Sequence, residues 1–326
     1  MTAILPWHLD SWHCLQQSLQ QGRLPHALLL AGPQGVGKSG FARQLAASLL
    51  CEQPQATGLA CGACRQCLLL AAGNHPDLRL LLPEEGKTQI GIDAVRELVA
   101  GNTLSVGGDA YRVFIIDPAD GMSQAAANAL LKTLEEPIEG TLIILLSAQV
   151  DRLPVTIRSR CQCLRFALPS EQDAIAWMEG NIQAPPEHAL QLLRLANGAP
   201  LRIPALIESG ELERHNRLLK DFVAIVAGQI SAVSASEAWL KDCELPSLLR
   251  YVNTWVTALV RQKMTHCAED AFPLLQSLPE RLDLKLLYQL LDRLHEIQRM
   301  SSNNLNPQLA LESVLLEWGR IANGES

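Results

Sequence analysis

The chain has 326 residues, and 48% of them are apolar, which is enough for more than one hydrophobic core. Lysine and arginine number 27 against 34 aspartates and glutamates, and this net charge of −7 excludes a free-standing basic DNA-binding protein, whose affinity rests on neutralising phosphates. Because no apolar run approaches the roughly 18 residues that span a bilayer and residues 1–21 lack an export signal, we expect a cytoplasmic protein without membrane contact.

The first motif in chain order is a phosphate-binding loop. Residues 27–31 predict a short buried strand and residues 41–50 have helical apolar spacing, so the loop between them leads into a helix N-terminus. In the pattern G-x-x-x-x-G-K-[ST], backbone N–H groups wrap phosphate oxygens, the lysine reaches the terminal phosphates and the hydroxyl ligates magnesium. The alternative is a glycine-rich turn with a chance Lys-Ser pair. The pattern predicts a site for ATP with Mg²⁺ formed by Gly32, Gly35, Gly37, Lys38 and Ser39.

A cluster of cysteines follows the loop. Cys51, Cys61, Cys64 and Cys67 have the spacing C-x9-C-x2-C-x2-C, in which the two-residue gaps let successive thiolates converge on one tetrahedral ion. Disulfides are disfavoured because we expect a reducing compartment. The spacing therefore predicts a structural Zn²⁺ module at about residues 51–67, with loose loop cysteines as the alternative. The other five cysteines are expected to be packing residues: Cys14, Cys161, Cys163, Cys243 and Cys267.

A second strand, residues 112–116, follows a predicted turn at residues 107–109 and ends at Asp117, where a P-loop ATPase holds its magnesium-binding aspartate. Such ATPases usually carry a glutamate next, which orients and deprotonates the attacking water. Pro118 has neither a carboxylate nor an N–H group, so nucleotide is expected to bind but to be poorly hydrolysed. The nearby carboxylates could substitute in principle, but a solvated helix end is the favoured interpretation of Asp120, Glu135 and Glu136.

Residues 141–147 form a continuous β-rich apolar run, which predicts a central buried strand. At its carboxyl end, Ser147 has two equal interpretations, a contact to the γ-phosphate or attacking water and a cap on the next turn. Beyond it stand Arg158 and Arg160, just before the composition changes at Pro169. One of them could reach the nucleotide of a neighbouring subunit, and an internal salt bridge is the alternative.

The rest of the chain predicts helices. Ser170 and Pro186 resemble helix starts, and Gly198 ends a helix. After a predicted hinge at Gly210 the sequence is leucine-rich with helical spacing and has no catalytic constellation. We therefore expect a nucleotide-binding-type domain at 1–166, a helical lid at 167–208 and a helical bundle at 209–326, with three core tryptophans in the bundle: Trp239, Trp255 and Trp318.

Together these residues resemble the delta-prime family of the bacterial DNA polymerase III clamp loader, within the AAA+ group. The markers are LPHA at 24–27, the phosphate-binding loop with its four-cysteine insertion, AANALLKTLEEP at 126–137 and SRC at 159–161. The related gamma/tau motor subunits share the loop, the cysteines and the last triplet. They carry the catalytic glutamate where this chain has Pro118.

The resemblance implies a fold, partners and a role. It implies an α/β P-loop AAA+ domain with a parallel sheet and a zinc-binding insertion, then a small helical lid and an all-α collar. It implies a hetero-pentamer with gamma/tau and delta subunits that loads the sliding clamp onto primed DNA. Arg160 would be an arginine finger acting in trans, and this chain's own ATPase activity would be weak or absent. In motor subunits the lid supplies a sensor arginine, and here Leu201 stands at that place.

Two other functions remain as alternatives. One is an active ATPase motor of the gamma/tau type, and the other is a zinc-bearing P-loop protein that binds nucleic acid directly. A polymerase active site is not predicted, because the sequence supplies no convincing set of converging carboxylates for two metal ions.

Overall fold

The computed structural model describes residues 4–84, 86–87, 89–100, 111–183, 185–265, 272–276, 278, 282–300 and 305–323. The predicted turn at 107–109 and Cys267 lie outside these residues. The chain divides into two compact units, Met1–Trp177 with Ala199–Leu201, and Met178–Gly198 with Arg202–Ser326. The finer division into three domains stays a prediction.

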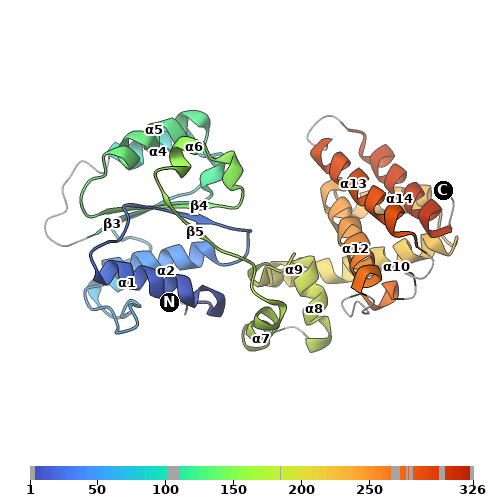
Figure 1. The fold of residues 1–326 in the computed structure, drawn as a ribbon, viewed down its shortest axis with the longest axis horizontal. Helices are drawn as coiled ribbons and strands as arrows, with labels where there is room; N and C mark the ends of the chain where they lie inside the picture. The colour runs from blue at the N-terminus through green and yellow to red at the C-terminus, as the bar shows by residue number, and fades with distance from the viewer. Residues whose placement is uncertain are drawn as a thin grey trace. The chain divides into compact units, whose positions relative to one another are not determined.

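The first unit is a five-stranded parallel sheet with helices on both faces (Figure 1). The strand order is β2-β3-β4-β1-β5. The strands are β1 (Ala27–Ala31), β2 (Leu78–Leu81), β3 (Arg112–Ile116), β4 (Thr141–Ser147) and β5 (Gln162–Arg165). The helices are α1 (Leu9–Gln20), α2 (Lys38–Leu50), α3 (Arg65–Ala71), α4 (Ile92–Ala100), α5 (Gln124–Glu135) and α6 (Val155–Arg158), and α7 (Glu171–Asn181) runs from this unit into the second.

Alternate residues of the strands fill two separate cores, because successive side chains of a strand point to opposite faces of the sheet. Leu28 and Leu30 pack with α1 and α2, whereas Leu29 packs with α4, α5 and α6. Figure 1 shows these two helical layers on either side of the sheet. Burial on both faces explains the uninterrupted apolar runs. The central position predicted for residues 141–147 is confirmed, since β4 is the middle strand.

The sheet brings the predicted nucleotide-binding residues to one edge. Gly32, Asp117 and Ser147 stand at the carboxyl ends of β1, β3 and β4, which are neighbours in the sheet. Because the strands are parallel, all three residues lie at the same edge, where ligands bind in open α/β sheets.

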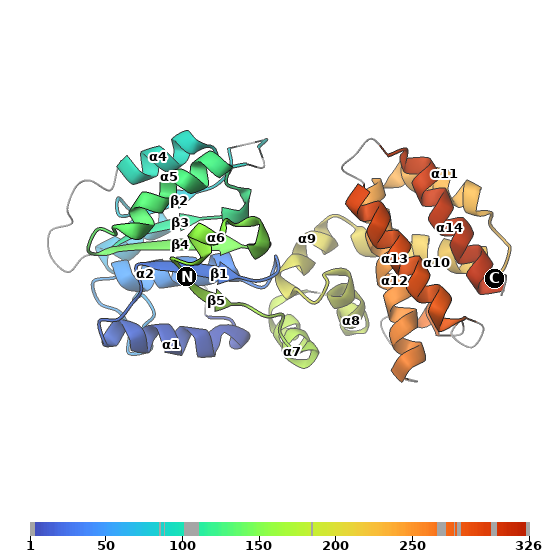
Figure 2. The same cartoon turned by 45° about the horizontal axis from the view of Figure 1, so that its top comes forward.

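The second unit is all-helical, as expected. Its last five helices form a bundle (Figure 2). Its helices are α8 (Pro186–Leu195), α9 (Ile203–Glu208), α10 (Glu211–Val226), α11 (Ala232–Asp242), α12 (Leu245–Thr265), α13 (Leu284–Met300) and α14 (Pro307–Asn323). Trp239, Trp255 and Trp318 are buried in it, as expected of core residues, and Trp318 stacks on Phe222 at 4.2 Å between ring centroids. In the described part of the chain, no helix combines the length and the apolar character that crossing a membrane requires.

A buried histidine is expected to make this unit sensitive to acid. His215 is fully buried, accepts a hydrogen bond from Trp255 Nε1 at 2.6 Å, and burial lowers its pKa to about 4. The unfolded chain protonates this histidine below about pH 6.5 while the folded chain keeps it neutral, so stability is full above that pH and falls as the pH drops towards 4.

We therefore expect unfolding at pH 4.5 to need about 2–3 kcal/mol less free energy than at pH 7 on account of this residue alone. Urea titrations of the full chain at the two pH values measure the difference. The variant His215→Gln keeps a hydrogen-bond acceptor but does not titrate, so its loss between the two pH values should be smaller by that amount. An equal loss in both proteins would contradict the assignment.

Candidate functional site

The phosphate-binding loop runs from the end of β1 into α2, as predicted, and the helix begins at Lys38 itself. Gly37 caps the helix with φ of 104°, a backbone conformation that favours glycine. A Cβ atom at Gly32 would lie 2.1 Å from the carbonyl oxygen of Phe166, the residue after β5, so no larger residue fits at this position. The loop glycines are therefore required by the local backbone as well as by phosphate binding.

Lys38 is turned back onto the loop. Its Nζ donates to the carbonyl oxygens of Gly32 at 2.6 Å and Pro33 at 2.7 Å, and the residue is only 8% exposed. Burial lowers the pKa of this amine, and the carboxylates of Asp117 and Asp120 oppose that shift. Lysine and acidic groups thus converge at the carboxyl edge of the sheet, which is the charge arrangement that a phosphate–magnesium complex needs.

The N-terminal segment braces the loop, a feature that sequence reasoning missed. Trp7 Nε1 donates to the carbonyl oxygen of Val36 at 2.9 Å. His8 is buried against Phe41 and Phe166, and burial lowers its pKa to about 4. These contacts join residues far apart in sequence, so no local pattern predicts them.

Leu201, for which the resemblance implied a missing sensor arginine, makes a second contact with the loop. The backbone N–H of Leu201 donates to the carbonyl oxygen of Gly35 at 3.2 Å. Its side chain lies 3.3 Å from the place of a Cβ at Gly37. An aliphatic side chain therefore packs against the phosphate-binding loop at this position.

At the sheet edge, Ser147 has the local role that the sequence left as one of two options. Its Oγ accepts from the backbone N–H of Gln149 at 3.1 Å, and its own carbonyl accepts from Gly32 N–H at 3.1 Å. Asp120 accepts from the N–H of Ala148 at 3.3 Å. Ser147 thus caps the turn after β4 and ties β4 to the loop, while a contact to phosphate stays a prediction.

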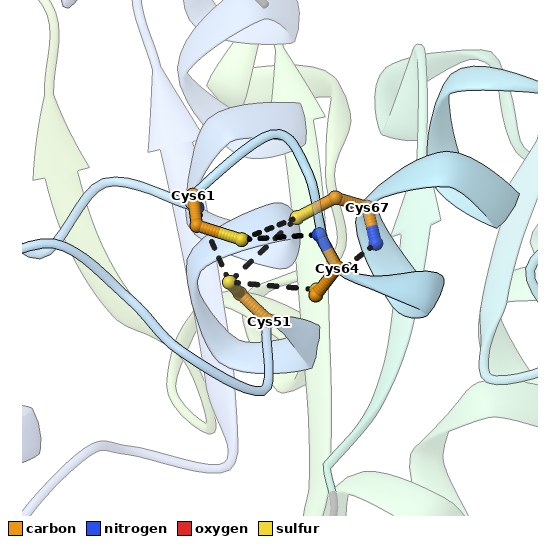
Figure 3. A group of neighbouring side chains, drawn as sticks. All are labelled: Cys51, Cys61, Cys64 and Cys67. Carbon is orange, nitrogen blue, oxygen red and sulfur yellow. Dashed lines mark hydrogen bonds between the residues drawn. The ribbon is translucent and has the colours of Figure 1, made fainter.

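The four clustered cysteines meet around one point (Figure 3). Cys51 and Cys64 sulfurs lie 3.9 Å apart, Cys61 and Cys67 sulfurs 3.9 Å, and Cys67 and Cys51 sulfurs 3.6 Å. All four lie within 4.8 Å of one another. A tetrahedral ion with Zn–S bonds of about 2.3 Å sets its sulfurs about 3.8 Å apart, so the cluster fits a metal such as zinc. Of the other cysteines, Cys14 and Cys163 are exposed, so the expectation that they pack inside the protein is wrong.

Backbone N–H groups donate hydrogen bonds to these sulfurs. The N–H of Cys64 donates to Cys61 Sγ at 3.3 Å, and that of Cys67 donates to Cys64 Sγ at 3.4 Å. The latter bond lowers the pKa of the Cys64 thiol to about 6, whereas burial raises that of Cys67 to about 12. Such N–H···S bonds favour the thiolate form that binds metal, and a bound cation overcomes the burial of Cys67.

The two arginines after β4 both make internal ion pairs. Arg160 Nη2 lies 2.6 Å from Glu135 Oε1, and Arg158 Nη1 lies 3.3 Å from Asp151 Oδ1. Glu135 lies at the exposed end of α5, as the sequence favoured, and its carboxylate pairs with Arg160, which the sequence did not predict. Both arginine side chains remain about one third exposed, at 35% for Arg160 and 33% for Arg158.

The sequence of this chain matches known protein families and relatives over nearly its whole length. The family described as "DNA polymerase III, delta subunit" matches residues 7–170, and "DNA polymerase III, delta subunit, C terminal" matches residues 209–320. The DNA polymerase III subunit delta′ of Pseudomonas aeruginosa is 36% identical over 98% of this chain and 99% of its own length. That of Escherichia coli is 33% identical over 95% of this chain and 94% of its own. The chain belongs to the delta-prime family of DNA polymerase III.

These matches confirm the delta-prime family that the sequence motifs predicted. A solved structure also shares the fold: the DNA polymerase III gamma subunit-related protein from Thermotoga maritima has a TM-score of 0.53 and 19% identity, and it covers 97% of this chain and 99% of its own. The phosphate loop, the cysteines, Asp117, Ser147 and the arginines all lie within the first region that matches the delta-prime family.

Proposed function

We propose that this chain is the delta-prime subunit of the clamp loader of DNA polymerase III. In this role it assembles with gamma/tau and delta subunits into a hetero-pentamer in the cytoplasm, and the complex places the sliding clamp on primed DNA during replication. The observation that carries the proposal is delta-prime family membership across nearly the whole chain, in both the sheet-containing and the helical regions.

We also propose that Arg160 acts as an arginine finger in the ATP site of the neighbouring motor subunit. A guanidinium that reaches transferring phosphate from another subunit neutralises the developing charge. Arg160 is partly exposed, and Val155, at the start of the helix just before it, is 68% exposed, which suits an interface between subunits. The test compares ATP turnover by the reconstituted loader carrying the native chain or Arg160→Ala.

The chain's own nucleotide site is proposed to bind ATP with Mg²⁺ and to contribute little hydrolysis. Gly32, Gly35, Gly37, Lys38 and Ser39 would hold the phosphates, and Asp117 would hold the magnesium ion. Pro118 supplies no base next to that aspartate. The turned-back Lys38 and the aliphatic Leu201 at the loop support a site whose role is in folding or assembly and not in turnover.

Lys38→Ala should weaken nucleotide binding to this chain and leave most clamp-loading activity. The lysine supplies the charge that reaches the terminal phosphates, whereas the other subunits of the clamp loader hydrolyse the ATP that drives loading. Binding of a fluorescent ATP analogue to the isolated chain and loading of a labelled clamp onto primed DNA measure the two effects. Loss of loading at saturating ATP, with assembly intact, would contradict this proposal and favour an active motor.

The metal in the cysteine cluster is proposed to be zinc. Four thiolates around one ion leave no position for a reacting water, so the site is structural.

A further inference from the structure

We propose that Glu135 is a positioning residue that holds the Arg160 guanidinium ready for the neighbouring nucleotide. This inference rests on the finger role proposed for Arg160. The observation behind it is the ion pair of 2.6 Å between Arg160 Nη2 and Glu135 Oε1. This contact joins the end of α5 to the segment just after α6.

Arg160 is held at two further points. Its Nη1 donates to the carbonyl oxygen of Thr156 at 3.0 Å and lies 3.4 Å from the hydroxyl of Ser159. Contacts of Nη1 and Nη2 fix the plane of the guanidinium, because the group is rigid and its donors have fixed directions. Among the described residues no acceptor meets its Nε–H donor, and Nη2 has a second hydrogen beyond the one directed at Glu135, so donors remain for phosphate oxygens.

Glu135 itself is rigidly placed. It is the last residue of α5, and the carbonyl oxygen of Leu134 just before it lies 3.1 Å from His26 Nε2. Since a carbonyl only accepts, His26 carries its hydrogen on Nε2 and ties the helix end to the start of the sheet. On the other side, the backbone N–H of Arg160 donates to the carbonyl of Ile157, whose side chain is fully buried. Both partners of the ion pair are therefore anchored through their backbones.

Fold stability does not explain this carboxylate. A negative side chain in the last turn of a helix is disfavoured by the partial negative charge of the helix C-terminus. An ion pair between side chains that are 35% and 50% exposed also adds little to stability. What the pair does achieve is one defined orientation for a long, flexible arginine at the surface, and reaction rates depend steeply on such orientation.

The neighbouring carboxylate offers a matched control. Glu136 follows Glu135 directly, is exposed, and makes no ion pair in the described part of the chain. Glu135→Gln and Glu136→Gln remove the same charge from adjacent positions, so a difference between them reports on the contact to Arg160 and not on the general electrostatic field.

The experiment is a double-mutant cycle in the reconstituted loader, with the other motor sites inactivated by substituting the lysine of their phosphate loops. Single-turnover ATP hydrolysis with clamp and primed DNA is measured for the native chain, Glu135→Gln, Arg160→Ala, the double variant and Glu136→Gln. We expect Glu135→Gln to lower the hydrolysis rate about tenfold at saturating ATP, with the ATP concentration for half-maximal rate unchanged. Glu136→Gln should change nothing, and Glu135→Gln should have no further effect once Arg160 is alanine.

Three results would overturn the inference while the finger role stands: an unchanged rate in Glu135→Gln, an increased rate, which would make Glu135 a brake, or the same tenfold loss when Arg160 is already alanine. An unchanged rate in Arg160→Ala would instead refute the finger role itself, and this inference with it.

Discussion

Arg160→Ala should lower ATP turnover at the motor site next to this chain by about 10³-fold. The guanidinium stabilises charge that develops on the phosphoryl group in the transition state, so the loss should appear in kcat with little change in KM. The total ATP turnover of the clamp loader underestimates the effect, because its other motor sites continue to hydrolyse ATP. Single-turnover hydrolysis in a loader whose remaining motor sites are inactive measures this site alone.

Arg158→Ala is the matched control. Arg158 has nearly the same side-chain exposure, and its partner Asp151 is fully solvated. Its removal should change turnover by less than about twofold, since surface substitutions away from a reacting group have small effects. Gel filtration checks that both variants assemble equally. A large loss in Arg158→Ala alone would assign the finger to that residue, and unchanged rates in both would leave the chain as a scaffold.

Buried strands were predictable from the sequence and edge strands were not. β1, β3 and β4 have the predicted bounds because both of their faces are covered, which demands continuous apolar runs. β2 and β5 are edge strands of four residues each, half exposed and interrupted by arginine or glutamine. Their sequences therefore lack both a continuous apolar run and a clean alternation.

The candidate site divides in the same way between local and long-range features. The phosphate-binding loop and the cysteine spacing are local patterns. In the structure the loop leads into the N-terminus of α2 and the four cysteine sulfurs lie close together, as the sequence predicted. The contacts of Arg160 with Glu135 and of Trp7 with Val36 depend on how distant segments pack. A single sequence records the residues of such pairs but not their pairing, so it predicts the exposed helix end at Glu135 but not the contact with Arg160.

Cys64→Ser should abolish metal binding and unfold the cysteine module. The module has almost no core of its own: its buried apolar cluster consists of two alanines and two of the four clustered cysteines, Ala47, Ala60, Cys51 and Cys67. Because so little apolar surface offsets little of the chain entropy lost in ordering the loop, we expect metal binding to supply the difference. Elemental analysis of the purified chain should give about one zinc per chain for the native protein and none for the variant.

The loss should spread beyond the module, because the loop docks on α1 and α2. Trp12 Nε1 donates to the carbonyl oxygen of Thr57 at 3.1 Å, and Ser48 Oγ donates to that of Gly58. Unfolding the loop exposes Trp12, which is 2% exposed in the fold. We expect a cost of about 4 kcal/mol, which lowers the Tm of a unit of this size by roughly 10 °C.

The control is Cys14→Ser, which removes an exposed thiol on α1 outside the cluster and should change neither zinc content nor Tm. Hydrogen exchange locates the effect: amides of residues 51–71 should lose protection in Cys64→Ser, and those of α1 should follow in part. Removing zinc from the native chain with a chelator should reproduce the same pattern. If Cys64→Ser lost its zinc yet kept its Tm and its protection, the module would be held by its contacts with Trp12 and Ser48, and the metal would have no structural role.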